Sequence, residues 1–456
     1  MKGSNKLTHR PYFPPNVAAS RREQPYICRL APREFGFDLE WLPLESTGPY
    51  NLCYGVRGSE DYQVVPLFDS VARVRGLEPD TEYEAFILAK GVKSATRLLR
   101  TGAIPDGATV INYLHPEDPQ YDFSGRYLCS PSLVRTKSGR LVAGMDLFGP
   151  RMAQNLTLLF KSEDEGKTWH YLTDLYPFYW GSLFTHRDVL YMLGLTTEYG
   201  NLQIAASYDE GESWTAPVTL FYGSSVLCRY GGAHRAPMHV VEEGGRLYTS
   251  SEYGSWEMGS HLPTVLSIDA EADLLNPENW SRTELLHFEG PWKEAAGSQG
   301  DTMEGNIGRD HDGKLYNFLR WKVGSYLRMR INEADPDAPL EFAGIVPAPV
   351  SNSMFRVIHR NGKYIWVTNR VTERVASFGR RCQRSVLSVL ESRDNKSFSL
   401  LFDVVNWEDE DPEYNGFQYP AHLLEGDTLS LVVRSGFNGA HNAHDANYSL
   451  FFRFEL

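Results

Sequence analysis

The stretch KSEDEGKTW, residues 161–169, returns in slightly changed form as ASYDEGESW at residues 206–214. Both copies read Ser-x-Asp-x-Gly-x-(Thr/Ser)-Trp. A phrase that recurs at this period is typical of an array of similar supersecondary units. The repeat therefore predicts further copies of the unit that contains it.

A hairpin pattern recurs six times downstream of about residue 108: an apolar strand, a tight polar turn and a second apolar strand. The glycine-bearing turns favour hairpins. The spacing leaves room for a four-stranded blade at each copy, which favours a six-bladed antiparallel β-propeller over five or seven blades. Residues 108–115 are expected to supply the outer strand of the last blade and close the ring. The copies are residues 133–144, 183–194, 239–250, 307–318, 357–368 and 422–433.

The repeated phrase is similar to the Asp-box of the sialidase-like β-propellers, and a degenerate third copy, SRDNKSF, stands at residues 392–398. In such a phrase Asp and Ser or Thr bond turn amides, Gly adopts positive φ, and Trp wedges between blades. A turn between the third and fourth strands would lie on the face opposite a site at the other strand ends. We therefore expect structural roles for Asp164, Trp169, Asp209 and Trp214.

Upstream of the repeats, residues 26–103 are predicted to be a separate module of short strands. FGFDLEW (35–41) alternates apolar and polar residues as a half-buried strand does. The phrase Leu-x-Pro-x-Thr-x-Tyr, ending at Tyr83, resembles the fibronectin type III sandwich, in which the tyrosine packs across the sheets. The sequence thus predicts an all-β chain with an N-terminal extension (1–25), an accessory β-sandwich (26–103) and a six-bladed propeller (104–456).

The composition excludes some classes of binding partner. A net charge of -13 argues against nucleic acid, because phosphate binding needs a basic surface. No apolar run reaches membrane-spanning length, so no membrane partner is predicted. The five scattered cysteines fit reduced thiols, and the N-terminus lacks the apolar core of a signal peptide. We expect a cytoplasmic protein, with a secreted one or a homo-oligomer left open.

Chemistry is expected at the propeller face where inner strands begin and second strands end. Glu304 opens the inner strand of the fourth blade and Arg320 ends the next strand. This pair resembles a sialidase segment in which a glutamate activates a tyrosine nucleophile and an arginine grips the substrate carboxylate. The resemblance implies that Glu304 is a base or activator and Arg320 an anion clamp. A salt bridge across the hairpin is the structural alternative.

Other positions depart from the sialidase pattern. Cys129 stands where an arginine is expected, and Asp146 is the only acid near the loop that should bring the general-acid aspartate. Phe417 occupies the place of the nucleophilic tyrosine, although Tyr419, two residues on and on the same strand face, could replace it. These departures argue against sialic acid itself as the substrate, because a shared scaffold need not share its reaction.

The chain offers further polar residues at the same predicted strand ends, where loops on a rigid ring commonly bind ligands. Tryptophans near these loops, Trp180, Trp256 and Trp321, would either stack on sugars or pack between blades. The spacing of the histidines near the C-terminus is not specific for a metal, so hydrogen bonding is expected there and neither a metal nor another cofactor is predicted. The additional residues are His234, Arg235, Glu252, Tyr253, Arg356, Asn369, Arg370, Arg434, His441, His444 and Asp445.

These residues favour a glycoside hydrolase acting on an acidic oligosaccharide or polysaccharide, since guanidinium groups match sugar carboxylates. Two carboxylates would flank the scissile bond. The predicted catalytic residues are Glu304 and Glu252, with Asp146 in reserve and Tyr419 and His234 as further candidates. The predicted substrate-binding residues are Arg320, Arg235, Arg356, Arg370, Arg434, His441 and His444.

Three alternatives remain open. A polysaccharide lyase would use His234 or Tyr419 to remove the proton next to a uronate carboxylate that Arg320 neutralises. A carbohydrate-binding propeller without catalysis would carry apolar or amide residues in place of Glu304 and Glu252. A protein-binding propeller would use the sandwich for docking.

Overall fold

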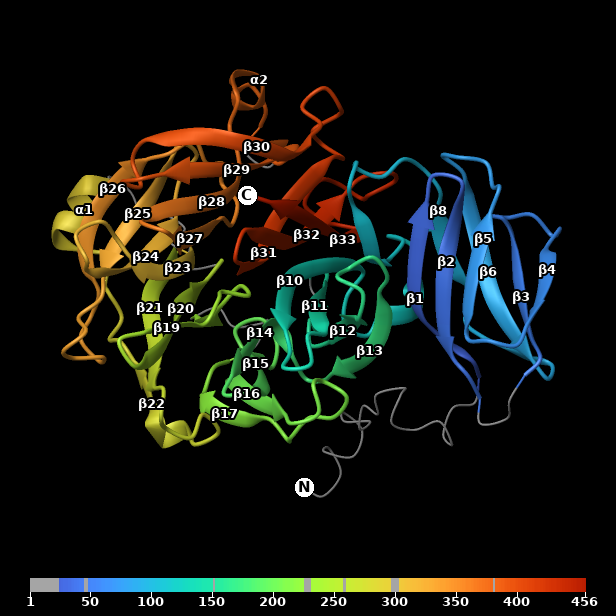
Figure 1. Cartoon of the computed structure of the whole chain (residues 1–456), viewed down its shortest axis with the longest axis horizontal. Coiled ribbons are helices and arrows are strands. Elements are labelled where there is room, and N and C mark those ends of the chain that lie inside the picture. The colour runs from blue at the N-terminus through green and yellow to red at the C-terminus, as the bar shows by residue number, and fades with distance from the viewer. Residues whose placement is uncertain are drawn as a thin grey trace.

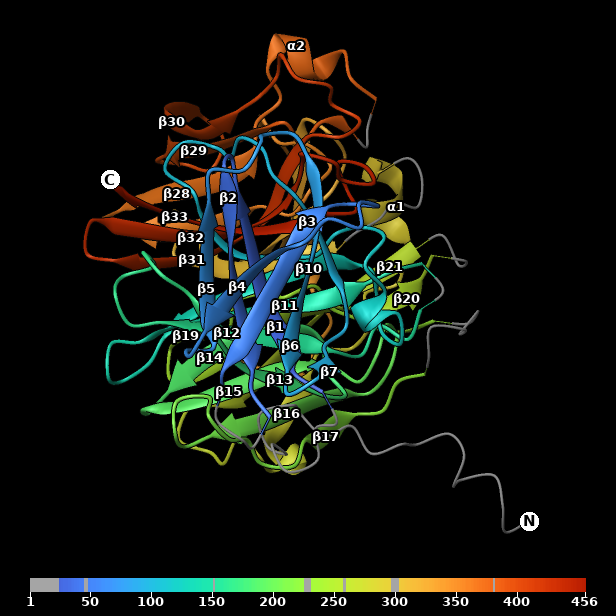
Figure 2. The ribbon, with the colours of Figure 1, turned by 90° about the vertical axis from the view of Figure 1, so that its right-hand side faces the viewer.

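The computed structural model describes residues 24–44, 48–150, 152–224, 231–256, 260–296, 303–379 and 382–456. Within these ranges the strands form a ring of antiparallel sheets and a smaller pair of sheets at its side (Figures 1 and 2). The predicted all-β class is thus confirmed. Residues 1–23 of the predicted N-terminal extension lie outside the described residues, as does Cys228.

Six antiparallel sheets form the propeller, one for each predicted hairpin, so the predicted blade count is confirmed. Each blade runs outward from an inner strand that lines the axis, and the inner strand of the third blade is in two pieces. The first three blades are β10 (Tyr127–Arg135), β11 (Leu141–Phe148), β12 (Thr157–Ser162) and β13 (His170–Leu175); β14 (Tyr179–His186), β15 (Val189–Leu195), β16 (Leu202–Ser207) and β17 (Val218–Phe221); and β18 (Gly232–His234) with β19 (Val241–Glu243), β20 (Arg246–Ser255), β21 (Ser260–Asp269) and β22 (Trp280–Arg282). The last three are β23 (Met303–Arg309), β24 (Leu315–Arg320), β25 (Ser325–Arg330) and β26 (Glu341–Pro347); β27 (Arg356–Arg360), β28 (Lys363–Asn369), β29 (Val386–Ser392) and β30 (Phe398–Asn406); and β31 (Gly416–Glu425), β32 (Thr428–Gly436), β33 (Tyr448–Glu455) and β9 (Thr109–Tyr113).

The ring closes where strand β9 completes the sixth blade. Tyr113 of β9 is the register partner of Tyr448 in β33, and the Leu114 amide donates to the Asn447 carbonyl at 2.9 Å. Three strands from the C-terminal end of the chain therefore share a sheet with one strand that precedes the first blade. The predicted closing role of residues 108–115 is confirmed.

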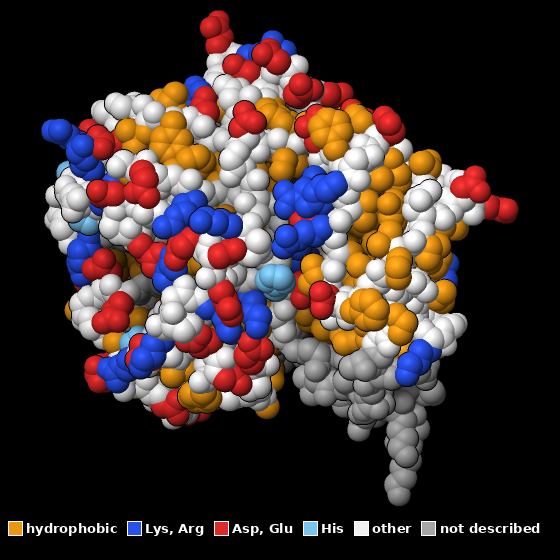
Figure 3. Space-filling model, turned by 45° about the vertical axis from the view of Figure 1, so that its right-hand side comes forward, with side chains coloured by type: hydrophobic (Ala, Val, Ile, Leu, Met, Phe, Trp, Pro, Cys, Tyr) orange, Lys and Arg blue, Asp and Glu red, His pale blue; other side chains and the backbone are white. Residues whose placement is uncertain are grey.

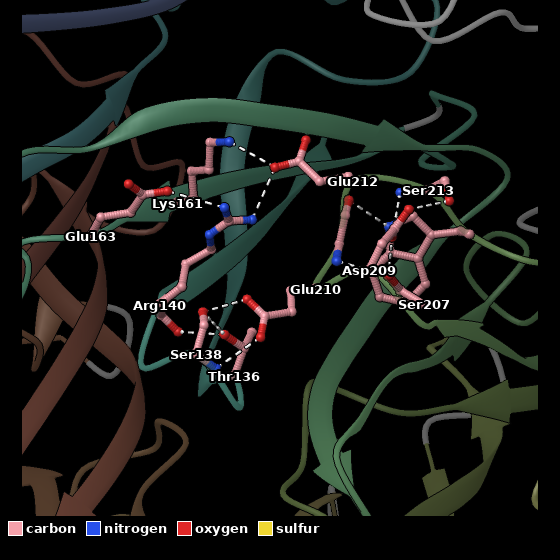
Figure 4. A network of polar contacts seen from close by, with 12 residues as sticks. Thr136, Ser138, Arg140, Lys161, Glu163, Ser207, Asp209, Glu210, Glu212 and Ser213 are labelled. Carbon is pink, nitrogen blue, oxygen red and sulfur yellow. Dashed lines mark hydrogen bonds and ion pairs between the residues drawn. The ribbon is translucent and has the colours of Figure 1, made fainter.

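Each copy of the repeated phrase forms the turn between the third and fourth strands of its blade. Figure 4 shows the second copy, where Asp209 accepts hydrogen bonds from the Ser213 amide at 2.8 Å and from the Ser207 hydroxyl at 2.9 Å. Gly211 takes a φ of 97°, which a side chain would strain. Glu210 accepts from the Ser138 amide in the first turn of the neighbouring blade, so both kinds of turn share one face.

The first copy repeats these contacts and adds the expected wedge between blades. Asp164 accepts from the Thr168 amide at 2.9 Å and from its hydroxyl at 2.6 Å. Trp169 is buried and packs edge-on against Phe451 of the sixth blade, with ring centroids 5.3 Å apart. These contacts serve the turn and the junction between blades.

Replacing Asp164 with alanine is expected to destabilise the fold by about 1–2 kcal/mol, because it leaves turn donors unpaired, and to leave binding and activity unchanged. Burial opposes ionisation, but hydrogen bonds from Thr168 lower the pKa of Asp164 below its ordinary 3.8. The stabilisation is therefore present above pH 3.8 and lost as the pH falls through the folded-state pKa. Urea unfolding at pH 7 and at pH 3 checks this. Glu163→Gln is the control, since its carboxylate is 68% exposed and pairs with Arg140 at the surface; equal effects of the two variants would contradict the prediction.

Two packed sheets form the N-terminal body, with Trp41 and Leu52 among the buried side chains of its core. Tyr83 is 5% exposed, and its hydroxyl accepts a hydrogen bond from the Glu78 amide at 3.1 Å. The first sheet holds β1 (Tyr26–Arg33), β2 (Gly36–Leu42) and β5 (Val71–Arg75). The second holds β4 (Gln63–Leu67), β3 (Tyr50–Val56), β6 (Glu82–Ala89) and β7 (Val92–Lys93), with β8 (Arg97–Arg100) also paired to β6.

The sandwich packs on the closing strand of the propeller. Arg29 donates to the carbonyls of Val110 and Ile111 in β9 at 2.9 and 2.7 Å. Arg97 also bonds β1, at the Ile27 carbonyl, and forms an ion pair with Asp118 at 2.5 Å, with side chains only 2% and 0% exposed. In the view of Figure 3, hydrophobic side chains gather over the sandwich, whereas charges of both signs are mixed over the propeller.

Helices are few and short. The described ranges hold α1 (Gly290–Ala296), α2 (Glu373–Ala376) and the 3-10 turns η3 (Pro119–Tyr121) and η4 (Pro277–Asn279). Among the described residues, no helix is long and apolar enough to cross a membrane. The four described cysteines, Cys28, Cys53, Cys129 and Cys382, are free thiols.

Candidate active site

The inner strands of four blades carry an irregularity at the same level of the ring. In the first, second, fourth and sixth blades the pairing register shifts, and a non-glycine residue takes a left-handed backbone within the shift. These residues are Ser130, Trp180, Glu304 and Tyr419, with φ values of 50°, 50°, 60° and 54°. Such bulges re-aim side chains, and strained backbone of this kind gathers at functional sites.

Three of the four bulge residues, Trp180, Glu304 and Tyr419, line a cavity of about 720 Å³. The bulge at Glu304 also needs the glycine that follows it, because a Cβ at Gly305 would collide with the Asn317 side chain. The cavity is lined by Phe148, Pro150, Tyr179, Trp180, Glu198, His234, Trp256, Glu304, Arg320, Asn352, Cys382, Arg384, Glu413, Tyr419, Arg434, Asn442, Ala443, His444 and Asp445.

A compact polar cluster joins the fourth and sixth blades at this cavity. The Tyr419 hydroxyl donates to Glu304 Oε1 at 2.5 Å, and Arg320 Nη1 donates to Glu304 Oε2 at 2.6 Å. The same Arg320 nitrogen donates to the Tyr419 oxygen at 3.0 Å. Burial and the charge of Glu304 raise the pKa of Tyr419, so the free site holds a phenol beside a carboxylate.

Two further arginines approach the same phenol ring. The guanidinium carbons of Arg384 and Arg434 lie 6.0 and 5.3 Å from the centroid of Tyr419. Arg384 donates to Asn352 O and Gln418 Oε1, and Arg434 to His444 O. Among the described residues neither arginine forms an ion pair with a carboxylate. Three arginines and Glu304 therefore act on Tyr419, although the cavity as a whole also contains the acids Glu198, Glu413 and Asp445.

Glu252 lies behind Glu304 on the neighbouring strand β20. One of its oxygens accepts the Glu304 amide at 2.9 Å, and the other lies 3.3 Å from His234 Nδ1. Burial and the charge of Glu304 raise the pKa of Glu252 to about 8. Burial lowers the pKa of His234 to about 3, so its imidazole is neutral over the physiological range.

Glu198 is a cavity carboxyl that the sequence analysis missed. It follows the second strand of the second blade, accepts hydrogen bonds from Gln154 Nε2 at 2.9 Å and Trp256 Nε1 at 3.1 Å, and has its pKa raised by burial. The sequence analysis expected chemistry where second strands end, and Glu198 stands at such an end. Its sequence context, TTEYGN, contains no other feature that marks it.

Arg384 was also missed, for a reason of geometry. It stands at the start of the third strand of its blade, after the loop that carries α2. Antiparallel strands bring the starts of third strands to the same face as the ends of second strands. A sequence analysis that also considered the starts of third strands would have included Arg384 beside the predicted Arg370.

The structure gathers part of the predicted set at one cavity. Glu304, Tyr419, His234, Arg320, Arg434 and His444 line it, and Glu252 stands directly behind. Trp180 and Trp256 line it too, whereas Trp321 is 3% exposed and packs in the core of its blade. His441 does not line the cavity; its ring stacks on Tyr127 and bonds Asp445 at 2.9 Å.

The structure does not bring Arg235 and Arg356 to the cavity. Arg235 is fully buried and donates to Ser182 Oγ and Thr249 Oγ1, both at 2.9 Å. Arg356 is fully buried as well, and donates to the carbonyls of Pro237 and Pro420, both at 2.7 Å. Both guanidinium groups thus bond neighbouring blades, and neither lines the cavity described above.

Asp146 and Arg370 also lie elsewhere. Asp146 is fully buried beneath the first blade's bulge, where the Thr157 hydroxyl donates to it and burial raises its pKa well above the ordinary value. Arg370 pairs with Asp403 on the outer strand of its own blade at 2.9 Å. In the parts of the chain that the structure describes, no three His, Cys, Asp or Glu side chains are grouped as around a metal ion.

Comparison with known proteins finds relatives by structure alone, since no family model and no curated protein sequence matches this chain. The α-L-arabinanase of Penicillium chrysogenum, solved with arabinobiose, aligns with a TM-score of 0.50 at 12% identity, over 77% of this chain and 98% of its own. Trypanosoma rangeli sialidase aligns with a TM-score of 0.50 at 15% identity, over 77% of this chain and 60% of its own. A Dyadobacter fermentans protein of unknown function gives 0.50 at 12% identity, over 77% and 99%. The chain therefore has the β-propeller fold of these proteins.

Proposed function

We propose that this protein is a glycoside hydrolase that acts on an acidic oligosaccharide or polysaccharide. The observation that carries the proposal is the Tyr419 hydroxyl held 2.5 Å from Glu304, with Arg320 bonded to both. A hydroxyl beside a base that a third group orients is the arrangement of an activated nucleophile. Glu304 takes the phenolic proton as the Tyr419 oxygen attacks the anomeric carbon.

The charges around Tyr419 select the kind of substrate. The hydrogen bonds of Arg384 and Arg434 go to neutral oxygens, of Asn352, Gln418 and His444, so both guanidinium groups remain available to a sugar carboxylate. A neutral phenol as nucleophile avoids the repulsion that a carboxylate nucleophile would exert on such a substrate. Tyrosine nucleophiles occur in this role in enzymes that cleave acidic sugars.

Glu198 is the proposed general acid. Burial raises the pKa of this carboxyl and so favours the protonated form that can donate to a leaving oxygen. Trp256, whose indole bonds Glu198, is 51% exposed and offers a ring face to a sugar at the same point. Protonation of the leaving group and attack by Tyr419 would then form a glycosyl–tyrosine that water hydrolyses.

The comparisons support this reading at the level of the scaffold. The arabinanase and the sialidase are both glycoside hydrolases by name and have the same propeller fold. Their low identities transfer neither linkage nor sugar. The replacement of arginine by Cys129 in the first blade still argues against sialic acid itself.

Product analysis tests the proposal. The protein and its Glu304→Gln variant would be incubated with a panel of uronate- and ulosonate-containing oligosaccharides, and the products weighed by mass spectrometry. Products that gain one water, lost in the variant, establish a hydrolase. If no member of the panel is cut but some bind equally to both proteins, the proposal fails and a carbohydrate-binding propeller replaces it.

A polysaccharide lyase is the second candidate, because the cluster of Tyr419, Glu304 and Arg320 could also serve that reaction. Tyr419 could remove the proton next to a uronate carboxylate that the three arginines neutralise. Unsaturated products that gain no water would identify this reaction in the same experiment.

Replacing Arg384 with methionine is expected to weaken binding of an acidic oligosaccharide by about 10- to 100-fold, the value of one charge-assisted hydrogen bond. Methionine keeps much of the side-chain volume. Isothermal titration calorimetry of both proteins with the acidic oligosaccharide and with its carboxyl-reduced form checks this. The variant should lose little affinity for the neutral form. Arg370→Met, which removes an arginine outside the cavity, is the matched control; a similar loss in both variants would contradict the prediction.

We also propose that residues 26–103 form a fibronectin type III-like accessory module, with residues 1–25 before it and residues 104–456 as the propeller. Two antiparallel sheets of this region and the bond from the Glu78 amide to the Tyr83 hydroxyl support the proposal. A tyrosine bonded back to the chain just upstream is typical of sandwich corners. The residues that line the described cavity all come from the propeller, in keeping with an accessory role for the module.

A further inference from the structure

His234 is a cavity residue whose two ring nitrogens have different surroundings. Nδ1 lies 3.3 Å from Glu252 Oε2, whereas Nε2 is buried and has no hydrogen-bond partner among the described residues. The ring itself is held tightly, with centroids of Trp180 and His261 each 4.3 Å away. His234 lines the cavity and Nε2 is its unpartnered ring nitrogen, so a ligand bound there could supply the missing partner.

The proton on Glu252 decides what that nitrogen can do. A protonated Glu252 donates to Nδ1, and the neutral imidazole must then carry its own proton on Nε2. An ionised Glu252 accepts from Nδ1, which leaves Nε2 without a proton. In the first state Nε2 is a hydrogen-bond donor, and in the second it is an acceptor.

We propose that Glu252 is a positioning residue whose proton sets the tautomer of His234, so that His234 offers the cavity a donor when Glu252 is protonated and an acceptor when it is ionised. A ligand oxygen that only accepts, such as a carboxylate or glycosidic oxygen, is bound in the first state. A ligand hydroxyl that donates is bound in the second. The inference concerns the protein alone and stands whether or not the proposed hydrolase activity is found.

The surroundings of Glu252 and His234 explain why Glu252 keeps its proton. Burial and the charge of Glu304 oppose ionisation of Glu252, whereas the Glu304 amide and Arg235 favour it. Burial opposes a positive charge on the His234 imidazole, Glu304 favours one, and Arg320 of the fourth blade opposes it. Ser250 donates to the second oxygen of Glu252 at 3.3 Å. The imidazole therefore stays neutral while the carboxyl titrates.

Burial raises the pKa of Glu252 to about 8, which puts the exchange of tautomers between pH 7 and pH 9. The Glu252 carboxyl is harder to ionise in the folded protein than in the unfolded one. The folded state keeps a proton that the unfolded state loses near pH 4.5, so this group lowers stability as the pH rises from 4.5 to 8. Glutamine at this position would remove that pH dependence.

Nitrogen-15 NMR of the full chain labelled at histidine tests the inference, because protonated and bare ring nitrogens resonate far apart. Spectra of His234→Gln, or of His234→Asn if the first variant does not fold, identify the signals of His234. At pH 6 the wild-type protein should show a protonated Nε2 and a bare Nδ1. At pH 9.5 the two should have exchanged.

The matched variant is Glu252→Gln, which keeps the shape of the side chain and cannot ionise. His234 in this variant should hold one tautomer from pH 6 to pH 9.5. A wild-type His234 that keeps one tautomer over the same range overturns the inference. So does a His234 that becomes doubly protonated at pH 6, or an exchange that persists unchanged in Glu252→Gln.

Discussion

Tyr419→Phe is expected to lower the turnover number on an acidic glycan by about 10³-fold or more, since it removes the proposed nucleophile and leaves its ring in place. The hydroxyl is 2.5 Å from Glu304 and 3.0 Å from Arg320, so both partners lose a hydrogen bond at the reacting atom. KM should change much less, because Arg384 and Arg434 still face the bound carboxylate. Steady-state kinetics on the substrate identified by product analysis would measure both constants.

Glu304→Gln should cause a loss of similar size, and the double variant should be no worse than either single one, because residues that act as one unit are not additive. Tyr253→Phe is the matched control: this tyrosine lies on β20 and is not among the cavity residues, so its loss should leave turnover unchanged. A Tyr419→Phe enzyme within tenfold of wild type would remove tyrosine from the chemistry. Glu304 or Glu198 would then have to act as the nucleophile.

The propeller was predictable because its signals are local. Hairpin turns, the repeated Ser-x-Asp-x-Gly phrase and the apolar run at residues 108–115 each depend on neighbours in sequence, and each lies in the structure where the pattern places it. The face opposite the repeated turns was predictable for the same reason, since alternating strands fix which ends lie together.

The individual site residues were harder to predict because the decisive features are not local. The register shift between Gln418 and Ala421 turns Tyr419 into the cavity and leaves Phe417, fully buried, in the hydrophobic core. A strict alternation of faces cannot anticipate that shift. Arg235 and Arg356 stand at inner strands and Arg434 near the end of a second strand, positions that the sequence analysis placed on one face. Only tertiary contacts separate the two arginines buried between blades from the one that lines the cavity.

The largest effect on stability is expected at the junction between the sandwich and the propeller. Arg97→Met should destabilise the protein by about 3–5 kcal/mol, because it leaves a buried charge without its partner. Asp118, fully buried, would keep only its bonds from the Gln120 and Leu98 amides at 3.0 and 3.4 Å. Arg97 would also stop donating to the Ile27 carbonyl at 3.1 Å. Urea denaturation followed by tryptophan fluorescence would measure the change.

Arg57→Met at the same junction is the matched control, since its two partners, Glu117 at 2.6 Å and Glu82 at 2.8 Å, are 64% and 36% exposed. Its loss should cost about 0–1 kcal/mol.

The double variant Arg97→Met with Asp118→Asn should recover part of the loss, because both charges are then gone and no unpaired carboxylate stays buried. Equal destabilisation by Arg97→Met and Arg57→Met would contradict the prediction. Arg97 bonds Ile27 of β1, and Arg29 of the same strand bonds β9, so the loss should also weaken the closure of the ring. The propeller should then unfold with the sandwich in one transition.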